Sequence, residues 1–383
     1  MAEREDLPEE IILNILSRLP VKSLIRFTSV SKRMHFIILT DPTFAQSQLK
    51  VARQQKTQSR RLLVFTDPPQ LESLPLDADT PSFGAPSSVR KLPLPFLQQP
   101  SDHDKFLGSC NGLVFLTLNV DFYYIWNPST GFFKKLPDPC FCSYGRNGRL
   151  AYGVGYLSAG DDYRVLVACC DLRVMAYEVE MFSLRTHIWE KIECGSYSNI
   201  GFQFEGTPFN DTLHWLNSYD KHEILCFNLA VKEFRRMWLP DFDNDGKSFC
   251  KLGVCGGCLC VSRHPEGVFD SIDLWVMREY GVSDSWTMLY SLKVSNPPEC
   301  LSFARRLLVV GSNTVAVNWS DEGFELMRID HKADQNVGHY MIKGRYVSIV
   351  EHEESLLGIS GYHPAEEKEQ VQILETHHKA SQS

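Results

Sequence analysis

The residues with the most reactive side chains are three closely spaced cysteines, Cys255-Gly-Gly-Cys258-Leu-Cys260, with His264 nearby. A structural zinc site needs a second, well-spaced pair of ligands, and a thioredoxin-like pair opens a helix that follows a strand. No second pair follows here, and Gly256-Gly257 is typical of a turn into a strand. We therefore predict small, buried cysteines in a strand and no metal site.

Two acidic clusters and one glycine-rich segment are further candidates for chemistry. Asp161-Asp162 and Asp241-Phe-Asp243-Asn-Asp245 could supply paired carboxylates for glycoside hydrolysis. The second cluster also resembles a calcium loop but lacks its closing glutamate. Gly108-Ser-Cys-Asn-Gly112 lacks the Lys-Ser/Thr pair of a phosphate-binding loop. We expect exposed turn residues in the clusters and a turn into a strand at the glycines, hence no catalytic residue and no cofactor.

Composition narrows the class of protein. The 383 residues are 43% hydrophobic and 22% charged, as in a soluble globular protein, and the formal net charge of −8 argues against a general nucleic-acid binder. The N-terminus lacks the basic and apolar regions of a secretory signal, and no apolar run is long enough to span a membrane. Twelve cysteines without a signal indicate reduced thiols. We expect the cytoplasm and/or nucleus, with neither nucleic acid nor membrane as a partner.

Short apolar runs recur along most of the chain and predict the elements that would position these residues. The runs lie 46 to 52 residues apart and occupy residues 62–65, 113–116, 165–168, 213–216, 259–262 and 307–310. A repeat of about fifty residues with several strands per unit is typical of propeller blades. The sequence thus contains six candidate blades, within a range of five to seven.

A second pattern recurs between these runs: a strand-like segment, a polar turn, and a second strand with an aromatic residue. In Trp126-Asn-Pro-Ser-Thr-Gly131 the Asn-Pro-x-x-Gly sequence supplies the backbone angles of a tight reversal. The same plan is followed by residues 177–189, 226–234 and 274–286. We predict hairpins whose aromatic side chains pack between adjacent sheets.

Residues 6–49 have a helical pattern instead. Asp6 can cap a helix, Pro8 suits a first turn, and Glu9 and Glu10 favour the positive end of the helix dipole. Apolar residues then form three short stripes, at 11–19, 21–27 and 30–38. Three helices in so few residues bury too little area to be stable alone. They are either a cap on the main domain or a docking module with an exposed apolar face.

These helices resemble the F-box. The matching residues are Leu7-Pro8-x-x-Ile11, Ile15-Leu16-x-x-Leu19-Pro20-Val21-Lys22-Ser23-Leu24-x-Arg26-Phe27, Val30-x-Lys32 and Asp41-Pro42-x-Phe44. Ser31 and Met34 depart from the Cys and Trp common in plant members. The resemblance implies binding to a Skp-family adaptor and, through it, to cullin and RING subunits. The implied adaptor-binding residues are Leu7, Pro8, Ile11, Ile15, Leu16, Leu19, Pro20, Val21, Leu24, Phe27 and Val30.

The following region resembles the F-box-associated domain of plant F-box proteins. The resemblance rests on Gly108-Ser-Cys-Asn-Gly112, Ile125-Trp-Asn-Pro-Ser-Thr-Gly131, Lys135-Leu-Pro137, and Tyr152-Gly-Val-Gly-Tyr156 through Asp162-Tyr-Arg-Val-Leu166. It covers roughly residues 100–240, and more weakly continues to about 350. It implies a kelch-like β-propeller that recognises an as yet unidentified protein target.

The combined prediction is a multidomain α + all-β protein. We expect a three-helix F-box at 1–49, a polar and basic linker or solvated helix at 50–61, a propeller of about six blades at 62–363, and a polar tail at 364–383. The expected function is that of a non-catalytic substrate receptor of an SCF-type (Skp–cullin–F-box) ubiquitin ligase, which promotes target ubiquitination and degradation. The alternatives are a glycosidase-like propeller hydrolase and an F-box interaction protein that acts outside a ligase.

Overall fold

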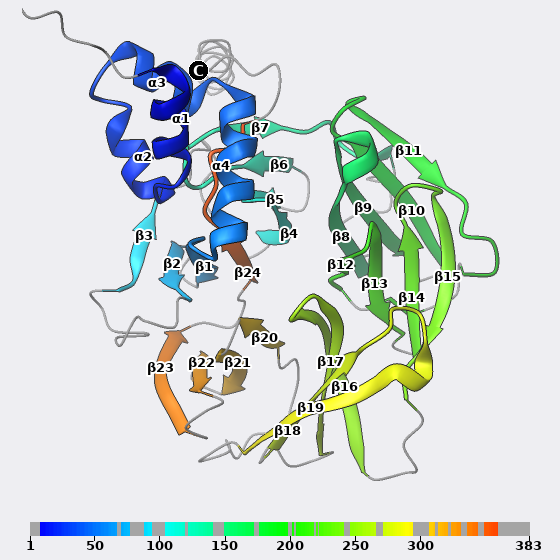
Figure 1. Ribbon diagram of the computed structural model, residues 1–383. Helices are drawn as coiled ribbons and strands as arrows, with labels where there is room; N and C mark the ends of the chain where they lie inside the picture. Colours follow the sequence, from blue (N-terminus) through cyan, green and yellow to red (C-terminus); the bar gives the residue numbers. More distant parts are fainter. Residues whose placement is uncertain are drawn as a thin grey trace, which may run out of the picture.

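The computed structural model describes residues 8–66, 70–76, 88–93, 104–118, 122–140, 149–171, 176–197, 201–202, 204–217, 220, 222–240, 246–265, 271–293, 306–310, 313–320, 323–330, 335–343 and 348–358. Within these residues, helices come first along the chain and strands follow in sheets arranged around a ring (Figure 1). The helices are α1 (Glu9–Ser17), α2 (Val21–Phe27), α3 (Lys32–Leu39) and α4 (Pro42–Gln55).

The helix boundaries follow from local residues. Pro8 and Pro20 precede the first turns of α1 and α2, where a missing N–H is harmless. Ser31 caps α3 by accepting a hydrogen bond from the Met34 N–H at 3.1 Å. Asp41 Oδ1 caps α4 by accepting from the Thr43 N–H at 2.9 Å. The proposed cap Asp6 lies outside the described residues.

The expectation of three helices is corrected by α4. Asp41 and Pro42 follow the third predicted stripe and are the N-cap and first residue of a fourth helix. This helix crosses the boundary placed at residue 49, and it ends with Lys56 in the left-handed conformation (φ +54°). The basic residues at 50–55 are therefore helical, and β1 begins four residues beyond Lys56. The predicted tail at 364–383 lies outside the described residues.

Six antiparallel four-stranded sheets follow, within the predicted range of five to seven blades. In order from the first strand of each sheet they are β24 (Ser348–Glu353), β1 (Arg60–Thr66), β2 (Gln70–Pro75), β3 (Arg90–Leu92); β4 (Lys105–Cys110), β5 (Leu113–Leu118), β6 (Phe122–Trp126), β7 (Phe133–Lys135); β8 (Arg149–Leu157), β9 (Asp162–Asp171), β10 (Ala176–Ser183), β11 (Ile188–Ile192); β12 (Thr207–Phe209), β13 (Thr212–Leu216), β14 (Glu223–Asn228), β15 (Glu233–Trp238); β16 (Lys247–Cys255), β17 (Cys258–Pro265), β18 (Ser271–Met277), β19 (Trp286–Lys293); and β20 (Arg306–Val310), β21 (Asn313–Ser320), β22 (Gly323–Asp330), β23 (Gln335–Lys343).

The first sheet closes the ring. Its first strand, β24, comes from the end of the described chain and pairs with β1, in a register that places Leu63 opposite Val350. The first strands β24, β4 and β8 contact one another from sheet to sheet, as do β8, β12, β16 and β20. The fold class predicted from the sequence, N-terminal helices followed by a β-propeller, is thus confirmed.

The apolar runs of the repeat fall on the same strand of the sheet in five sheets and on a different strand in the sixth. The first five apolar runs lie on β1, β5, β9, β13 and β17, each the second strand of its sheet. The sixth run, residues 307–310, lies on β20, which is a first strand; the second strand there is β21. The predicted position of the sixth repeat was therefore wrong by one strand, because two neighbouring apolar strands give the same signal in a sequence.

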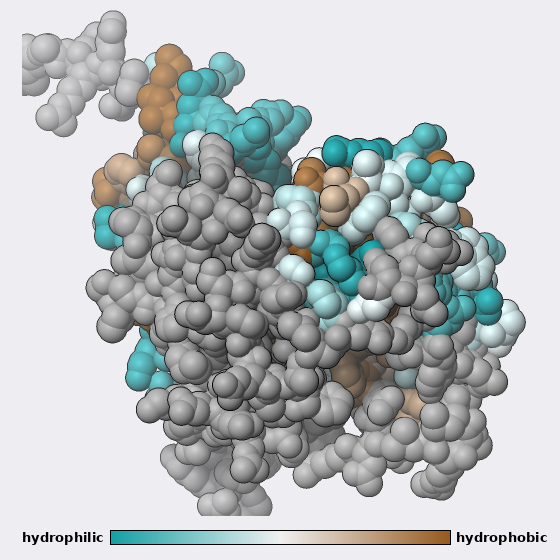
Figure 2. All heavy atoms as spheres, turned by 90° about the horizontal axis from the view of Figure 1, so that it is seen from below, coloured by the Kyte–Doolittle hydropathy of each residue, from teal (hydrophilic) through white to brown (hydrophobic). Residues whose placement is uncertain are grey.

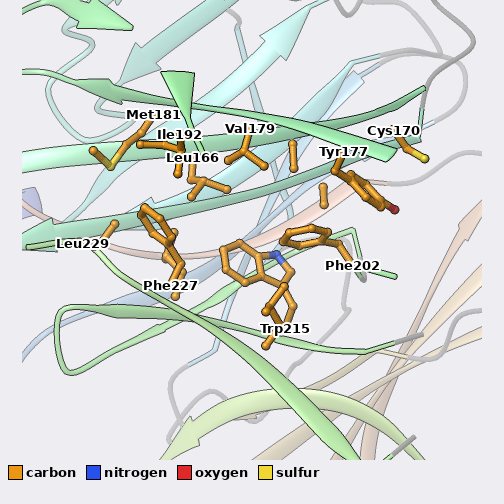
Figure 3. Close-up of a cluster of buried hydrophobic side chains, with 14 residues drawn as sticks. Leu166, Cys170, Tyr177, Val179, Met181, Ile192, Phe202, Trp215, Phe227 and Leu229 are labelled. Carbon is orange, nitrogen blue, oxygen red and sulfur yellow. The ribbon is translucent and has the colours of Figure 1, made fainter. Parts of the chain in front are cut away.

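Aromatic side chains of the hairpins pack against neighbouring sheets, as predicted: Trp189 on β11 donates from Nε1 to the Pro137 carbonyl at 2.6 Å, and Trp286 on β19 to the Trp238 carbonyl at 3.2 Å. Trp215 is fully buried, donates from Nε1 to the Tyr152 carbonyl at 3.2 Å, and lies edge-on to Phe202 at a centroid distance of 5.5 Å. Figure 3 shows this cluster between β9–β11 and β13–β14. A Cβ on Gly206 would lie 2.6 Å from the Trp215 ring, so the close packing requires glycine there. No described helix is long and apolar enough to cross a membrane.

Candidate functional site

The helices form a small core of their own. Leu16, Leu24, Ile38 and Phe44 are buried in it, and Leu356, from the segment after β24, completes it. The helical module therefore shares its core with the propeller domain, because one of its core residues comes from the far end of the described chain. The helices thus pack on the main domain, as the expectation of a cap requires. Their outer surface does not take part in this core.

That outer surface carries exposed apolar side chains. Ile11 is 46% exposed and Ile15 51% on α1, Phe27 is 40% exposed at the end of α2, and Val30 is 67% exposed in the turn after it. Figure 2 shows hydrophobic residues (brown) on the edge of the molecule formed by the N-terminal helices, beside hydrophilic ones (teal). We call Pro8, Ile11, Ile15, Pro20, Phe27 and Val30 the apolar helix surface. Such a surface is typical of a docking site.

The structure sorts the predicted adaptor-binding residues into three groups. The six residues of the apolar helix surface are exposed, Leu19 is half-buried, and Leu16, Val21 and Leu24 belong to the core of the module. Leu7 lies outside the described residues. Sequence reasoning missed Phe36, which is 60% exposed on α3. Ile37 and Ile38 form the buried stripe of α3, so a large apolar residue just before them in the sequence could have been recognised as exposed.

Helix α4 is attached to the propeller through a polar junction. Arg53 forms an ion pair with Glu353 on β24 and donates to Asn111 Oδ1 at 2.7 Å. Asn111 Nδ2 in turn donates to the Tyr163 hydroxyl at 3.0 Å. The segment Gly108–Gly112 is the turn predicted from its sequence, since Asn111 and Gly112 join β4 to β5. This turn thus places the helices on the second sheet.

The Asn-Pro-x-x-Gly turn holds the segment that follows β24. Asn127 is fully buried, and its Nδ2 donates to the carbonyls of Ser355 at 3.1 Å and Leu357 at 2.8 Å. Its Oδ1 accepts from the Ser129 N–H at 2.8 Å, which shapes the turn. Because Leu356 lies between the two held carbonyls, Asn127 fixes the residue that completes the helical core. The motif positions the helices and has no chemistry of its own.

His352 lies under the same junction. Its ring is 1% exposed, and burial lowers its pKa to about 4, so it is neutral near pH 7. Nε2 lies 3.2 Å from the Gly112 carbonyl, which can only accept, so Nε2 carries the proton and Nδ1 is the acceptor.

The cysteine segment is a hairpin turn, as predicted. Cys255 and Cys258 face each other across Gly256-Gly257, which adopt φ of +58° and +76°. Burial raises the pKa of Cys255 and of the buried Cys260, which disfavours the thiolate needed for metal or redox chemistry. Within the described residues, no three His, Cys, Asp or Glu side chains are grouped to hold a metal ion.

The acidic pair at the β8–β9 turn has structural roles, and the expectation that both residues are exposed is wrong for Asp162, because its hydrogen bonds draw it into the interior. Asp162 is buried, pairs with Arg164 at 3.0 Å, and accepts from the Ser183 hydroxyl at 2.8 Å. Asp161 accepts from the Tyr156 hydroxyl at 2.7 Å, and this bond raises the pKa of Tyr156 to about 12. The two carboxylates thus hold turns together. The second acidic cluster, at 241–245, lies outside the described residues.

The two faces of the propeller differ in their connections. Turns from first to second strands lie on the face that carries the helices, and several are two residues long, as at 111–112, 210–211 and 256–257. Because the strands are antiparallel, the last strand of each sheet ends on the other face, where the chain leaves toward the next sheet through the described residues 136–140 and 193–197. Long connections on a rigid scaffold are where binding residues concentrate.

Comparison with known proteins agrees with the division of the chain into N-terminal helices and a propeller. The F-box domain family model matches residues 5–45, and the F-box associated beta propeller domain matches residues 76–358. F-box protein CPR1 of Arabidopsis thaliana is 28% identical over 79% of this chain and 76% of its own length. F-box/kelch-repeat protein At3g23880 of the same plant is 26% identical over 81% and 84%. TolB from Acinetobacter baumannii, at a TM-score of 0.47 and 10% identity over 81% of this chain and 72% of that chain, is too distant to carry an argument.

Proposed function

The chain belongs to the F-box proteins that carry an F-box-associated β-propeller domain, and on this premise we propose that it is the substrate-recognition subunit of a Skp–cullin–F-box ubiquitin ligase. The observation that carries the proposal is the apolar helix surface. Side chains such as Ile15 and Val30 are about half or more exposed, although the module has its own buried core. An adaptor of the Skp family with an apolar groove would cover them.

The predicted adaptor-binding residues then act in two ways. The exposed residues of the apolar helix surface contact the adaptor directly, and Phe36 extends the contact on α3. Leu16, Val21 and Leu24 act indirectly, because they pack the core that holds α1 and α2 in place. Met34 is half-buried against this core, so the departure from the usual Trp changes the packing of α3 more than the outer surface.

The mechanism is geometric. The propeller holds a target protein while cullin and RING subunits, recruited through the adaptor, bring a charged ubiquitin-conjugating enzyme close to the target's lysines. The gain in rate comes from proximity and orientation. Orientation requires a stiff link between helices and propeller, and the contacts of Arg53, Asn127 and Leu356 supply it. The chain itself is proposed to be non-catalytic and to work in the cytoplasm or nucleus.

The proposed target surface is the face opposite the helices. The helix face is partly covered by α4 and α2, whereas no described helix covers the other face, where the last strand of each sheet ends. A target bound there would leave the adaptor surface unobstructed. Phe204→Ala, which removes a side chain that is 58% exposed before β12, should reduce target capture and leave adaptor binding unchanged.

The experiment that tests the function is reconstitution from full-length proteins. The chain is co-expressed with a Skp-family adaptor, cullin and RING subunits, with Ile15→Asp as the variant and Ile188→Asp, on the exposed edge of β11, as its matched control. We expect the wild type and the control to co-purify with all three subunits and Ile15→Asp to lose them. Retention of the adaptor by Ile15→Asp would refute the docking surface. Adaptor binding without cullin would favour a role outside a ligase.

A further inference from the structure

A cavity of about 270 Å³ lies where the helices meet the closing sheet. Val21 and Ile25 on α2 form one wall, Leu63 on β1 and Leu92 on β3 form another, and Pro128 of the Asn-Pro-x-x-Gly turn forms a third. The walls are therefore apolar and come from three separate parts of the chain. A cavity of this size suits a molecule smaller than a typical drug.

The charged groups around the cavity are mostly positive. Lys22 and Arg26 lie one helical turn apart on α2, and Arg61 and Arg90 come from the sheet, against the single acidic residue Glu354. Arg61 is held in place by its hydrogen bond from Nε to Ser73 Oγ at 2.6 Å. In a chain of net charge −8, this concentration of positive charge is unusual. Positive charge beside apolar walls attracts an anion more strongly than it would in open water.

Two polar atoms of the lining residues are closed off from the cavity. His352 Nδ1 and Ser129 Oγ are buried and have no hydrogen-bond partner among the described residues. A molecule in the cavity would therefore contact the apolar walls and the basic side chains, and not these two atoms.

We propose that this cavity binds a small organic anion with an apolar body and one carboxylate or phosphate group. The apolar body lies against Ile25 and Leu92, and the acid group lies near Arg26 and Arg90. Because the walls come from both α2 and the closing sheet, the bound molecule stiffens the link between helices and propeller. The proposal does not depend on the ligase function.

The test uses the full-length protein and four probes. 4-Hydroxyphenyl phosphate and 4-hydroxybenzoate each carry an apolar ring and one acid group, which is a phosphate in the first and a carboxylate in the second. Hydroquinone lacks the charge, and inorganic phosphate lacks the apolar body. Binding is followed by calorimetric titration and by the melting temperature. We expect saturable binding and a rise of several degrees with at least one of the first two probes, and neither effect with the other two.

Arg90→Gln should weaken that binding at least tenfold, and Arg185→Gln, an exposed arginine at the distant β10–β11 turn, should leave it unchanged. Arg26→Gln, which removes the second arginine near the acid group, gives a second variant if Arg90→Gln does not fold, and it should also weaken binding. The proposal is overturned if no organic acid binds saturably at millimolar concentration, which means that the cavity holds only water. Equal effects of inorganic phosphate, or equal affinities of the Arg90 and Arg185 variants, overturn it as well.

Discussion

Gly112→Ala tests whether the propeller closes against the β4–β5 turn in the way described. Gly112 has a φ of +78°, and a Cβ added to it would lie 2.2 Å from Ser355 Oγ and 2.7 Å from the Glu353 carbonyl oxygen. These contacts are closer than a real Cβ allows, and the carbonyl is backbone, so the segment after β24 has to move. The change is a single methyl group placed at the point where β24, the second sheet and the helical module meet.

The expected loss of stability has two parts. An alanine in the left-handed region costs about 1 kcal/mol or slightly more. Movement of the segment also breaks the hydrogen bonds from Asn127 to the Ser355 and Leu357 carbonyls, each worth about 1 kcal/mol. Together these give a decrease of about 3 kcal/mol in the free energy of unfolding, before any loosening of Leu356 in the helical core is counted.

The control is Gly257→Ala in the β16–β17 turn. Gly257 has almost the same φ, +76°, but an added Cβ there has nothing within 4 Å. Only the backbone part applies, so we expect a decrease of about 1 kcal/mol. Urea unfolding of the wild type and both variants gives the comparison. A double variant with Ser355→Gly should recover part of the loss, because it removes the closest atom but leaves the Glu353 carbonyl. Equal destabilisation by Gly112→Ala and Gly257→Ala would refute the reasoning.

Three further predictions concern the helices and pH. Ile15→Ala should weaken adaptor binding about fivefold, since burying the exposed half of an isoleucine is worth about 1 kcal/mol. The control Ile188→Ala on β11 should leave the dissociation constant, measured by calorimetry, unchanged. Leu24→Ala removes a fully buried side chain and should lower the free energy of unfolding by about 2–5 kcal/mol, seen as a lower melting temperature even without adaptor. His352 has a pKa of about 4 in the folded protein and takes up a proton near pH 6.5 when unfolded. The free energy of unfolding should therefore be full above pH 6.5 and fall toward pH 4, by up to about 3 kcal/mol. His352→Gln should flatten this dependence in urea unfolding at several pH values, and an unchanged slope would contradict the assignment.

The local elements of this protein are readable from its residues. Proline at 8 and 20 marks the starts of α1 and α2, and the Asn-Pro-x-x-Gly turn after Trp126 predicts its hairpin, because these signals act within a few residues. Apolar runs near fifty residues apart predict sheets of a propeller for the same reason. Elements are misplaced where one stretch of sequence fits two structures. Asp41-Pro42 follows one helix and starts another. The run at 307–310 lies on the first strand of its sheet instead of the second.

The sequence by itself determined the elements, the repeat and the resemblance to two domain families, because each depends on residues close together in the chain. Only the tertiary structure decided which apolar residues of the helices are exposed and which are core, since Leu16 and Ile15 are neighbours in one stripe and differ only in what packs on them. The junction likewise joins Arg53, Asn111 and Glu353, which lie up to 300 residues apart. No local pattern carries such contacts, because they exist only once the last strand has closed the ring.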